Sequence, residues 1–435
     1  MFQRRTGAVV AALVSGALVC TACSGGDGHS ASGGWEFPSE DPTATIKVLS
    51  ILSLDVEGMQ SVVDKFEEEH PSINVEWETV PFSDLNSVVD SRVSQKNGSI
   101  DVYWVDQPRV ASLASRGYLE DITDQFAGRT DKWDEPSKEA SSYDGKLWST
   151  PIATSTQILY YNKTLLDKAG VDAPSADPEH RITWEQLTAD AKTVQEKTGV
   201  QWGMALGQFD RYYQMQPILM GTGGGTGVTG EDNLTPDVVD ENWISALEWY
   251  GSLFSDGVAP RGEEEVQDDF IAGNIAYIEQ GTWLVDGMAD IDFEWGAALS
   301  PTFEGKDPIT PTGSWSLGMN PYSKAKEASA IFMDWMSSED GYTKYRPTPD
   351  LAATSTGRET YFNREIFQGP AGQDAIKIID YELANTAVTR PSTIGYVEFE
   401  EILNRAFADV RNGGDPRSAL ETAQQQLETA WAVYE

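Results

Sequence analysis

Short apolar runs typical of β-strands alternate with helical runs through the body of the chain, and this alternation restricts the fold more than any other feature of the sequence. Residues 46–52 predict a strand. Residues 57–69 carry apolar side chains at helical spacing until Pro71 stops them, and residues 73–77 alternate as a second strand. This order is a βαβ unit, and its continuation predicts an α/β fold in which helices flank a parallel sheet.

A third predicted strand, over residues 100–105, is followed directly by Asp106. Ligands of open α/β sheets bind at the carboxyl ends of the strands, so Asp106 stands where a binding carboxylate is expected. The alternative is that Asp106 only caps the helix that follows. No Pro-rich linker divides residues 45–435, so any two lobes must exchange chain through short crossovers.

Two further local signals lie between residues 183 and 227. Thr183 begins a capping-box sequence, which predicts a helix that Gly199 ends. The glycine-rich stretch 221–227 lacks the Gly-Lys-Ser/Thr ending of a phosphate loop and follows a helical run instead of a strand. We therefore interpret it as a surface turn.

The body of the chain lacks the residues of metal and Cys/His chemistry. Its only histidines are His70 and His180, and neither cysteine belongs to it, so we expect no tetrahedral metal site and no cofactor. Neither histidine accompanies a Gly-x-Ser-x-Gly motif, which argues against a Ser-His-Asp triad. Acids are so abundant that the sequence does not exclude a glycosidase-like carboxylate pair.

The first residues have the order of a secretory signal, with Arg4 and Arg5 before an apolar run over 8–19. Residues 19–26 resemble a bacterial lipobox in which Cys23 becomes the lipid-bearing N-terminus, although Cys20 stands where Leu is usual. A plain signal peptide cut nearby is the alternative. We predict a signal peptide over residues 1–22, a flexible Gly/Ser/Asp/Pro tether over 23–44, and an exported protein lipid-anchored to the outer face of the cell membrane.

The net charge of the chain argues against nucleic acids and anionic membrane surfaces as partners. The 435 residues contain 31 Lys and Arg against 69 Asp and Glu, a formal net charge of -38. Such a surface repels phosphate backbones and anionic headgroups, so we expect no nucleic-acid binding, membrane contact only through the lipid anchor, and a monomer.

Aromatic side chains in small and polar surroundings are the positive signal. Trp283 follows Gly281, Trp315 closely follows Gly313, and Tyr213 follows an Asp-Arg pair. Sugar recognition requires aromatic faces that stack on pyranose C–H groups beside paired donors and acceptors for the hydroxyls. The alternative for each Trp is ordinary core packing.

Several stretches, in order and spacing, resemble the family-1 solute-binding lipoproteins of bacterial ABC importers, which include maltose- and trehalose-binding proteins. The resemblance runs from about residue 45 to residue 430, and its most specific stretches are residues 100–106, 143–151, 160–163, 270–276, 281–283 and 313–318. It implies the type II periplasmic-binding-protein fold, with two α/β lobes joined by crossovers near residues 154, 296 and 337. The implied lobes are 45–154 plus 297–337, and 155–296 plus 338–435.

The resemblance also implies the residues of a sugar site between the lobes. Asp106 supplies a carboxylate to hydroxyls, Trp283 and Trp315 supply stacking faces, and Tyr213 lies near the cleft. Ser155 departs from the acid or amide found at its position in many members. The other implied contacts are Asp55, Ser155 and Thr156, with Arg390 and Tyr396 as in the trehalose-type branch.

The resemblance implies that the protein binds a sugar, a di- or oligosaccharide, in the cleft between the lobes. Lobe closure and delivery to an ABC permease with a separate ATPase would follow. No bond is made or broken, so the protein is expected not to be an enzyme. Two alternatives stay open: a secreted carbohydrate-active hydrolase, and a surface protein that docks another macromolecule. The sequence leaves open which sugar or polyol is bound, its linkage and its affinity.

Overall fold

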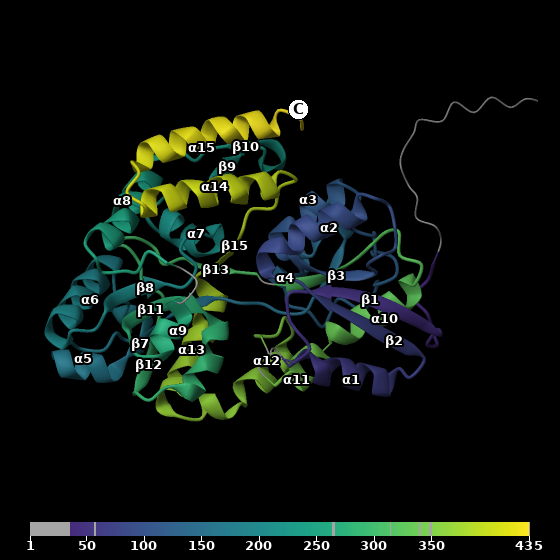
Figure 1. Cartoon of the computed structure of the whole chain (residues 1–435), viewed down its shortest axis with the longest axis horizontal. Helices are drawn as coiled ribbons and strands as arrows, with labels where there is room; N and C mark the ends of the chain where they lie inside the picture. Colours follow the sequence, from purple (N-terminus) through teal and green to yellow (C-terminus); the bar gives the residue numbers. More distant parts are fainter. Residues whose placement is uncertain are drawn as a thin grey trace, which may run out of the picture. The chain divides into compact units, whose positions relative to one another are not determined.

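Two separate β-sheets, each with its own hydrophobic core, organise the chain (Figure 1). The structure is a computed structural model, and it describes residues 35–55, 58–262, 266–313, 315–338, 341–347 and 350–434. The predicted signal peptide and the predicted lipidation site Cys23 lie outside these residues. Within the described part, no helix is both long enough and apolar enough to cross a bilayer.

The first sheet has the strand order β2-β1-β3-β14-β6. Its parallel part is the predicted βαβ unit and its continuation, because β1 pairs in parallel with both β2 and β3. Strand β14 then runs antiparallel to β3 and β6. The bounds are β1 (Ala44–Ser50), α1 (Met59–Glu69), β2 (Ile73–Thr79), α2 (Leu85–Val93), β3 (Val102–Asp106), β6 (Ser149–Pro151) and β14 (Trp315–Met319).

The second sheet has the order β12-β7-β11-β8, with β7 antiparallel to both of its neighbours. Thr183 caps the N-terminus of α6 as predicted, since its side chain accepts a hydrogen bond from Gln186 N, and Gly199 ends the helix with φ 76°. The bounds are β7 (Gln157–Asn162), α5 (Lys163–Ala169), α6 (Trp184–Thr198), β8 (Trp202–Leu206), β11 (Ile275–Gly281), β12 (Trp295–Ala298) and α13 (Pro370–Asn385).

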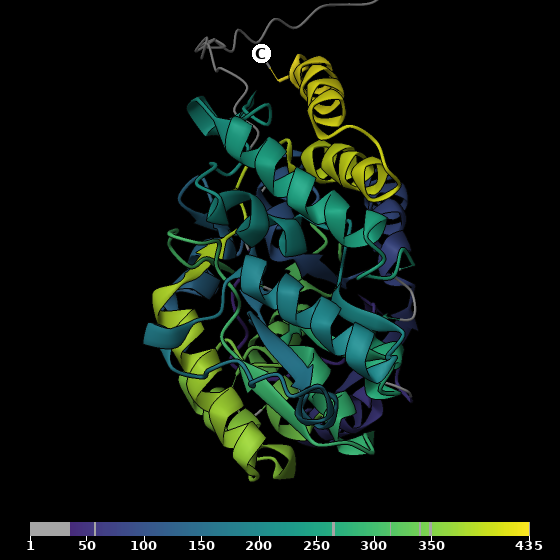
Figure 2. The same cartoon turned by 90° about the vertical axis from the view of Figure 1, so that its left-hand side faces the viewer.

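A helical layer lies beyond the second sheet, where α14 (Tyr396–Arg411) packs against α15 (Pro416–Trp431) and α8 (Glu241–Ser255) (Figure 2). The remaining elements are η1 (Phe82–Asp84), η2 (Gln107–Arg109), α3 (Val110–Ser115), α4 (Glu135–Ala140), β4 (Ser142–Tyr143), β5 (Lys146–Leu147), η3 (Pro178–His180), α7 (Tyr212–Gly221), β9 (Val228–Thr229), η4 (Glu231–Asn233), β10 (Thr235–Pro236), α9 (Val266–Ile271), η5 (Thr282–Asp290), β13 (Thr310–Thr312), α10 (Lys326–Met336), α11 (Tyr342–Tyr345), α12 (Ser355–Phe362), η6 (Glu365–Phe367) and β15 (Ala387–Thr389).

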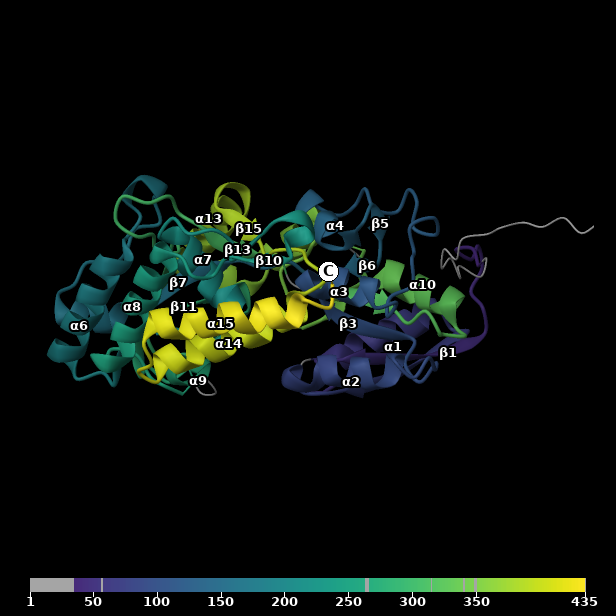
Figure 3. The same cartoon turned by 90° about the horizontal axis from the view of Figure 1, so that it is seen from above.

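Short segments join the two halves, which lie on either side of them in Figure 3. The first follows β6 and leads into β7, close to the predicted crossover at residue 154. Strands β13 and β15 pair in parallel and form a separate two-stranded sheet. Strand β12 remains in the second sheet through Ala298, and Phe303 packs in the second core. The chain therefore leaves this sheet later than the predicted crossover at residue 296.

Residues at the start of the described chain are held against the first half of the protein. The Trp35 indole N–H donates to Glu120 Oε1 at 2.9 Å, and Gln125 Nε2 donates to the Trp35 carbonyl at 3.0 Å. The Arg129 guanidinium lies 3.5 Å from the centroid of the Phe37 ring. These contacts correct the extent of the predicted tether, because the chain is attached from Trp35 onward and not only from residue 45.

Candidate ligand-binding site

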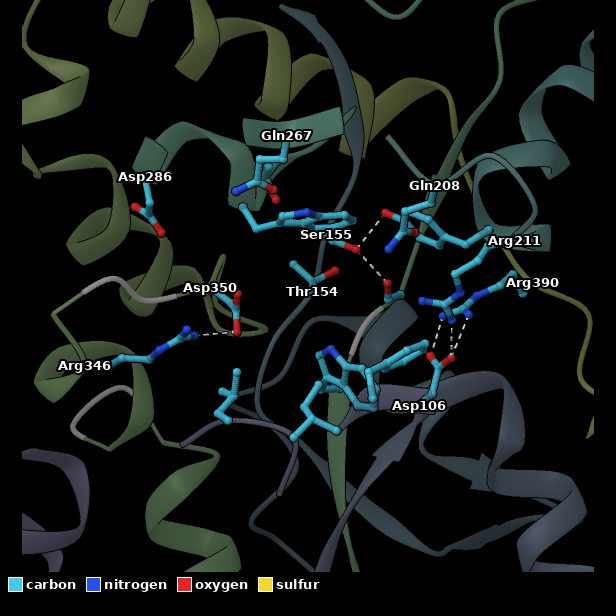
Figure 4. A pocket seen from close by; sticks show the side chains of 18 residues that line it. Asp106, Thr154, Ser155, Gln208, Arg211, Gln267, Asp286, Arg346, Asp350 and Arg390 are labelled. Carbon is cyan, nitrogen blue, oxygen red and sulfur yellow. Dashed lines mark hydrogen bonds and ion pairs between the residues drawn. The ribbon is translucent and has the colours of Figure 1, made fainter. Parts of the chain in front are cut away.

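A pocket of about 420 Å³ is lined by residues from both halves and from the segments that join them (Figure 4). Among the described residues, three carboxylates and three guanidinium groups line it, together with aromatic rings. The structure brings six of the nine predicted ligand contacts to its lining, although they are far apart in the sequence. These six are Asp106, Ser155, Tyr213, Trp283, Trp315 and Arg390.

Asp106 and Arg390 form a two-pronged ion pair at one end of the pocket. Asp106 is the last residue of β3 and lies opposite Trp315 in the register of β3 and β14, while Arg390 follows β15. Arg390 Nη1 lies 2.9 Å from Asp106 Oδ2, and Nη2 lies 2.6 Å from Oδ1. Burial alone raises the pKa of Asp106, but the guanidinium groups of Arg390, Arg211 and Arg109 hold it below its ordinary value.

Further charged residues extend this pair into a network that links the two halves. Arg211 Nη2 lies 3.4 Å from Asp106 Oδ2 and 3.5 Å from Glu400 Oε1, and Arg109 donates to the other oxygen of Glu400. Arg109 lies in η2, directly after β3, whereas Glu400 lies on α14. Sequence reasoning missed Glu400, since no local pattern marks an acid whose partner is 291 positions away.

Aromatic rings form two walls of the pocket. Tyr213 and Trp283 have ring centroids 6.0 Å apart on one side, and Phe82 meets Trp315 edge to face at 5.8 Å on the other. Arg211 stacks over Phe82 at 4.2 Å. Phe82 was not predicted as a site residue, yet its side chain is 38% exposed. The only sequence signal for it is its place shortly after the end of a strand, because its ring partners come from distant segments.

Two glycines shape the backbone beside these rings. A Cβ atom at Gly281 would lie 2.0 Å from the Trp283 ring, so only glycine lets the indole fold back over the end of β11. Gly313 has φ +91°, and its carbonyl accepts a hydrogen bond from Ser155 Oγ at 2.7 Å. Because Ser155 donates there, it accepts from the Tyr213 hydroxyl at 2.8 Å. The Tyr213 ring is thereby fixed beside the pocket.

The opposite end of the pocket carries a second set of charged groups (Figure 4). Arg346 Nη1 donates to Asp350 Oδ2 at 2.8 Å, and Asp286 accepts from Arg364. Burial raises the pKa of Asp286 against the attraction of Arg364. Polar clusters therefore occupy both ends of the pocket, with the aromatic rings between them.

The structure does not bring the other three predicted contacts to the pocket. Asp55 is exposed in the loop after β1, which presents Ile51 and Leu52 to the pocket instead. Thr156 is fully buried in the first joining segment, where its hydroxyl donates to Thr310 Oγ1 at 3.2 Å. Tyr396 is buried at the start of α14 with its ring against Phe399. Within the described part of the chain, no three His, Cys, Asp or Glu side chains form a group that could hold a metal ion.

Comparison with known proteins agrees with this architecture. Residues 53–343 match the family of bacterial extracellular solute-binding proteins. The maltodextrin-binding protein MdxE of Bacillus subtilis is 23% identical over 333 residues, which are 74% of this chain and 76% of the relative. A solved ABC substrate-binding protein of Listeria monocytogenes in complex with cycloalternan has a TM-score of 0.78 at 23% identity, covering 90% of this chain and 100% of that one.

A second solved structure is the GacH receptor of Streptomyces glaucescens, studied without ligand and with acarbose. It has a TM-score of 0.76 at 24% identity and covers 91% of this chain and 100% of its own. These likenesses confirm the predicted two-lobed type II fold, and the matching proteins carry the names of binding proteins and not of enzymes. The chain belongs to the family of bacterial extracellular solute-binding proteins.

Proposed function

We propose that the pocket binds an uncharged di- or oligosaccharide. The observation that carries this proposal is the pair of aromatic walls, Tyr213 with Trp283 and Phe82 with Trp315, between two clusters of polar groups. Aromatic faces bury the C–H surfaces of sugar rings, and the ends of the pocket offer donors and acceptors to hydroxyl groups. Polar groups at both ends favour a ligand longer than one ring.

The charges of the pocket support a neutral ligand. Asp106, Asp286 and Asp350 are matched in number by Arg211, Arg346 and Arg390, and each of the three carboxylates contacts a guanidinium group. A charged ligand would add a charge that the lining does not balance, and it would lose hydration on entering. The names of the similar proteins, which refer to maltodextrin, cycloalternan and acarbose, support the same chemical class.

The proposed mechanism is capture by closure of the two lobes. The first half supplies Trp315, Phe82 and Asp106, and the second half supplies Trp283 and Tyr213. A ligand that contacts both sets binds the closed form more tightly, so it shifts the open–closed population by that difference in affinity.

We further propose that Cys23 carries the lipid anchor of an exported protein and that the closed form delivers its sugar to an ABC permease. We retain residues 45–154 plus 297–337 and 155–296 plus 338–435 as approximate lobes, with the boundary at 296 moved beyond Phe303, which packs in the second core.

A thermal-shift panel tests the proposal directly. The panel holds maltose, trehalose, maltotriose and mannitol, with glucose 6-phosphate and glucosamine as charged controls. A neutral sugar that binds only the folded state stabilises it by about 2.7 kcal/mol at 100 times its Kd, which raises the unfolding midpoint. We expect the shift for at least one neutral oligosaccharide and none for the charged controls. A shift confined to a charged control contradicts the proposal, as does the absence of any shift with every carbohydrate.

A further inference from the structure

Glu279 is a fully buried carboxylate beneath the ligand pocket that the proposed mechanism does not use. It lies on β11, and its side chain is 0% exposed. Ser300 Oγ donates to its Oε1 at 2.5 Å, and Gln214 Nε2 donates to its Oε2. Among the described residues, no Lys, Arg or His pairs with it. The ionised form of Glu279 therefore accepts two hydrogen bonds, but no cation pairs with it to balance its charge.

The groups that face Glu279 explain why it lacks a cation. The neighbouring strands place Leu159 and Leu206 opposite it, and α7 contributes Gln214 and the nearby Tyr213 hydroxyl. On the remaining side lies a second buried carboxylate, Glu382 of α13, which accepts from Ser300 N at 3.0 Å. The Arg181 guanidinium donates to both oxygens of Glu382, at 2.6 and 3.0 Å, and not to Glu279. Burial, with the Glu382 charge, raises the pKa of Glu279 to about 7.

Gln214 connects Glu279 to the pocket. Its amide oxygen accepts a hydrogen bond from the backbone N–H of Gln208 at 3.2 Å, and its amide nitrogen faces Glu279. Gln208 lines the pocket, and its carbonyl accepts from the backbone N–H of Arg211, which lines the pocket as well (Figure 4). The orientation of one amide group therefore holds the turn that carries two pocket residues.

Protonation of Glu279 at Oε2 changes the Gln214 group that must face this oxygen from a hydrogen-bond donor to an acceptor. A proton on Oε1 is accepted by the Ser300 hydroxyl and leaves Gln214 as it is, whereas a proton on Oε2 makes that oxygen a donor, so the group facing it must accept and the Gln214 amide turns over. Its nitrogen then faces the N–H of Gln208, two donors meet, and that hydrogen bond is lost. The turned amide places its oxygen against Gln157 Oε1, which now accepts from Gln214 at 3.3 Å, so Gln157 must turn as well and offer its Nε2, a buried group that has no acceptor in the present arrangement.

We propose that Glu279 is a proton-binding positioning residue, which through Gln214 holds Gln208 and Arg211 in place when it is ionised and releases them when it is protonated. Ligand affinity then falls as the solution becomes more acidic. The affinity part of this inference rests on the proposed sugar-binding function, whereas the titration of Glu279 does not.

Two measurements on the full chain test it. The first is calorimetric titration of maltotriose, or of the panel sugar with the largest shift, at pH 5.5, 7 and 8.5. We expect the Kd to rise about three- to tenfold from pH 8.5 to 5.5, a change in binding free energy that corresponds to the loss of about one hydrogen bond. Glu279→Gln, which mimics the protonated form, should bind weakly at every pH. The matched control Asp190→Asn removes another acid whose pKa burial raises, outside this network, and should keep the wild-type pH dependence.

The second measurement needs no ligand. The infrared carbonyl band of protonated carboxyl groups should grow in a step near pH 7 in the wild type, and this step should be missing from Glu279→Gln. If that variant does not fold, Gln214→Met breaks the same connection with Glu279 intact, and its affinity should no longer depend on pH. A sugar that binds equally at all three pH values overturns the inference, and so does the lack of the infrared step. A panel in which no sugar binds contradicts the proposed function instead.

Discussion

Single residues of the pocket are held in place mainly by one another. Asp106 and Arg390 are 7% and 3% exposed, so their ion pair is buried even without a ligand. Asp106 Oδ2 accepts from both Arg390 and Arg211, whereas Oδ1, which accepts from Arg390 Nη2, has a further lone pair that can accept from a sugar hydroxyl while the ion pair stays intact. The ion pair therefore orients the carboxylate for a ligand and also joins the two halves.

This burial makes the pair matter for stability as well as for binding. Removing one partner leaves an uncompensated buried charge, so Asp106→Ala or Arg390→Ala should each lower the free energy of unfolding by about 3 to 5 kcal/mol. The double variant should lose less than the sum of the two. Urea unfolding of the three variants measures this coupling. Additive losses would show that the two side chains do not interact in solution.

Gly281 offers a test of the aromatic wall that leaves every polar group in place. In Gly281→Ala the new Cβ meets the Trp283 ring at 2.0 Å, so the indole must move away from the pocket. The lost stacking face is worth about 1.5 to 3 kcal/mol, and affinity for the panel sugar should fall by about ten- to a hundredfold. Calorimetric titration measures it. Gly225→Ala is the matched control, since nothing lies within 4 Å of its Cβ, and unchanged binding by both variants would contradict the stacking role of Trp283.

At the scale of elements, the sequence predicted what local patterning determines. The βαβ unit over β1, α1 and β2 follows from apolar spacing, and the start of α6 follows from the cap at Thr183. Asp106 was located because it stands at the end of a strand, which is a topological rule. Glu400 and Phe82 were missed, since their partners come from distant segments that only the folded chain brings together. The resemblance to a family supplied the remaining contacts, and of these the structure does not bring Asp55, Thr156 and Tyr396 to the pocket.

The segment before β1 is an element that composition alone misjudged. Its Gly and Ser content predicted a free tether, yet Trp35 and Phe37 pack on the first core. Trp35→Ala and Phe37→Ala should each lower the free energy of unfolding by about 1 to 2 kcal/mol, because each loses part of a buried aromatic side chain. Thermal unfolding measures the loss. Glu36→Ala, at the exposed position between them, is the control and should be neutral, and equal midpoints for all three variants would mean that the segment is detached in solution.

At the scale of the whole molecule, the second half carries two carboxylates with no exposed surface, Glu279 and Glu382. Arg181 pairs with Glu382 and not with Glu279, so folding of this half places the Glu279 carboxylate where ionisation is disfavoured. The folded state therefore holds a proton on Glu279 up to about pH 7, whereas the unfolded chain releases it near the ordinary glutamate value of 4.5. Stability then depends on pH through this one group, whatever ligand the pocket takes.

The sign of that dependence follows from proton binding. Between pH 4.5 and about 7 the folded state binds more protons at Glu279 than the unfolded state, so this group's contribution is fully present below pH 4.5 and is lost as pH rises through 7. The loss amounts to about 3 kcal/mol over the interval. The side chain introduced by Glu279→Gln does not titrate. As the pH rises from 4.5 to 8, the unfolding free energy of the wild type should therefore fall by that amount relative to that of the variant. Urea unfolding of both proteins at pH 4.5, 6 and 8 measures it, and a difference that stays constant across these values would mean that Glu279 is ionised throughout.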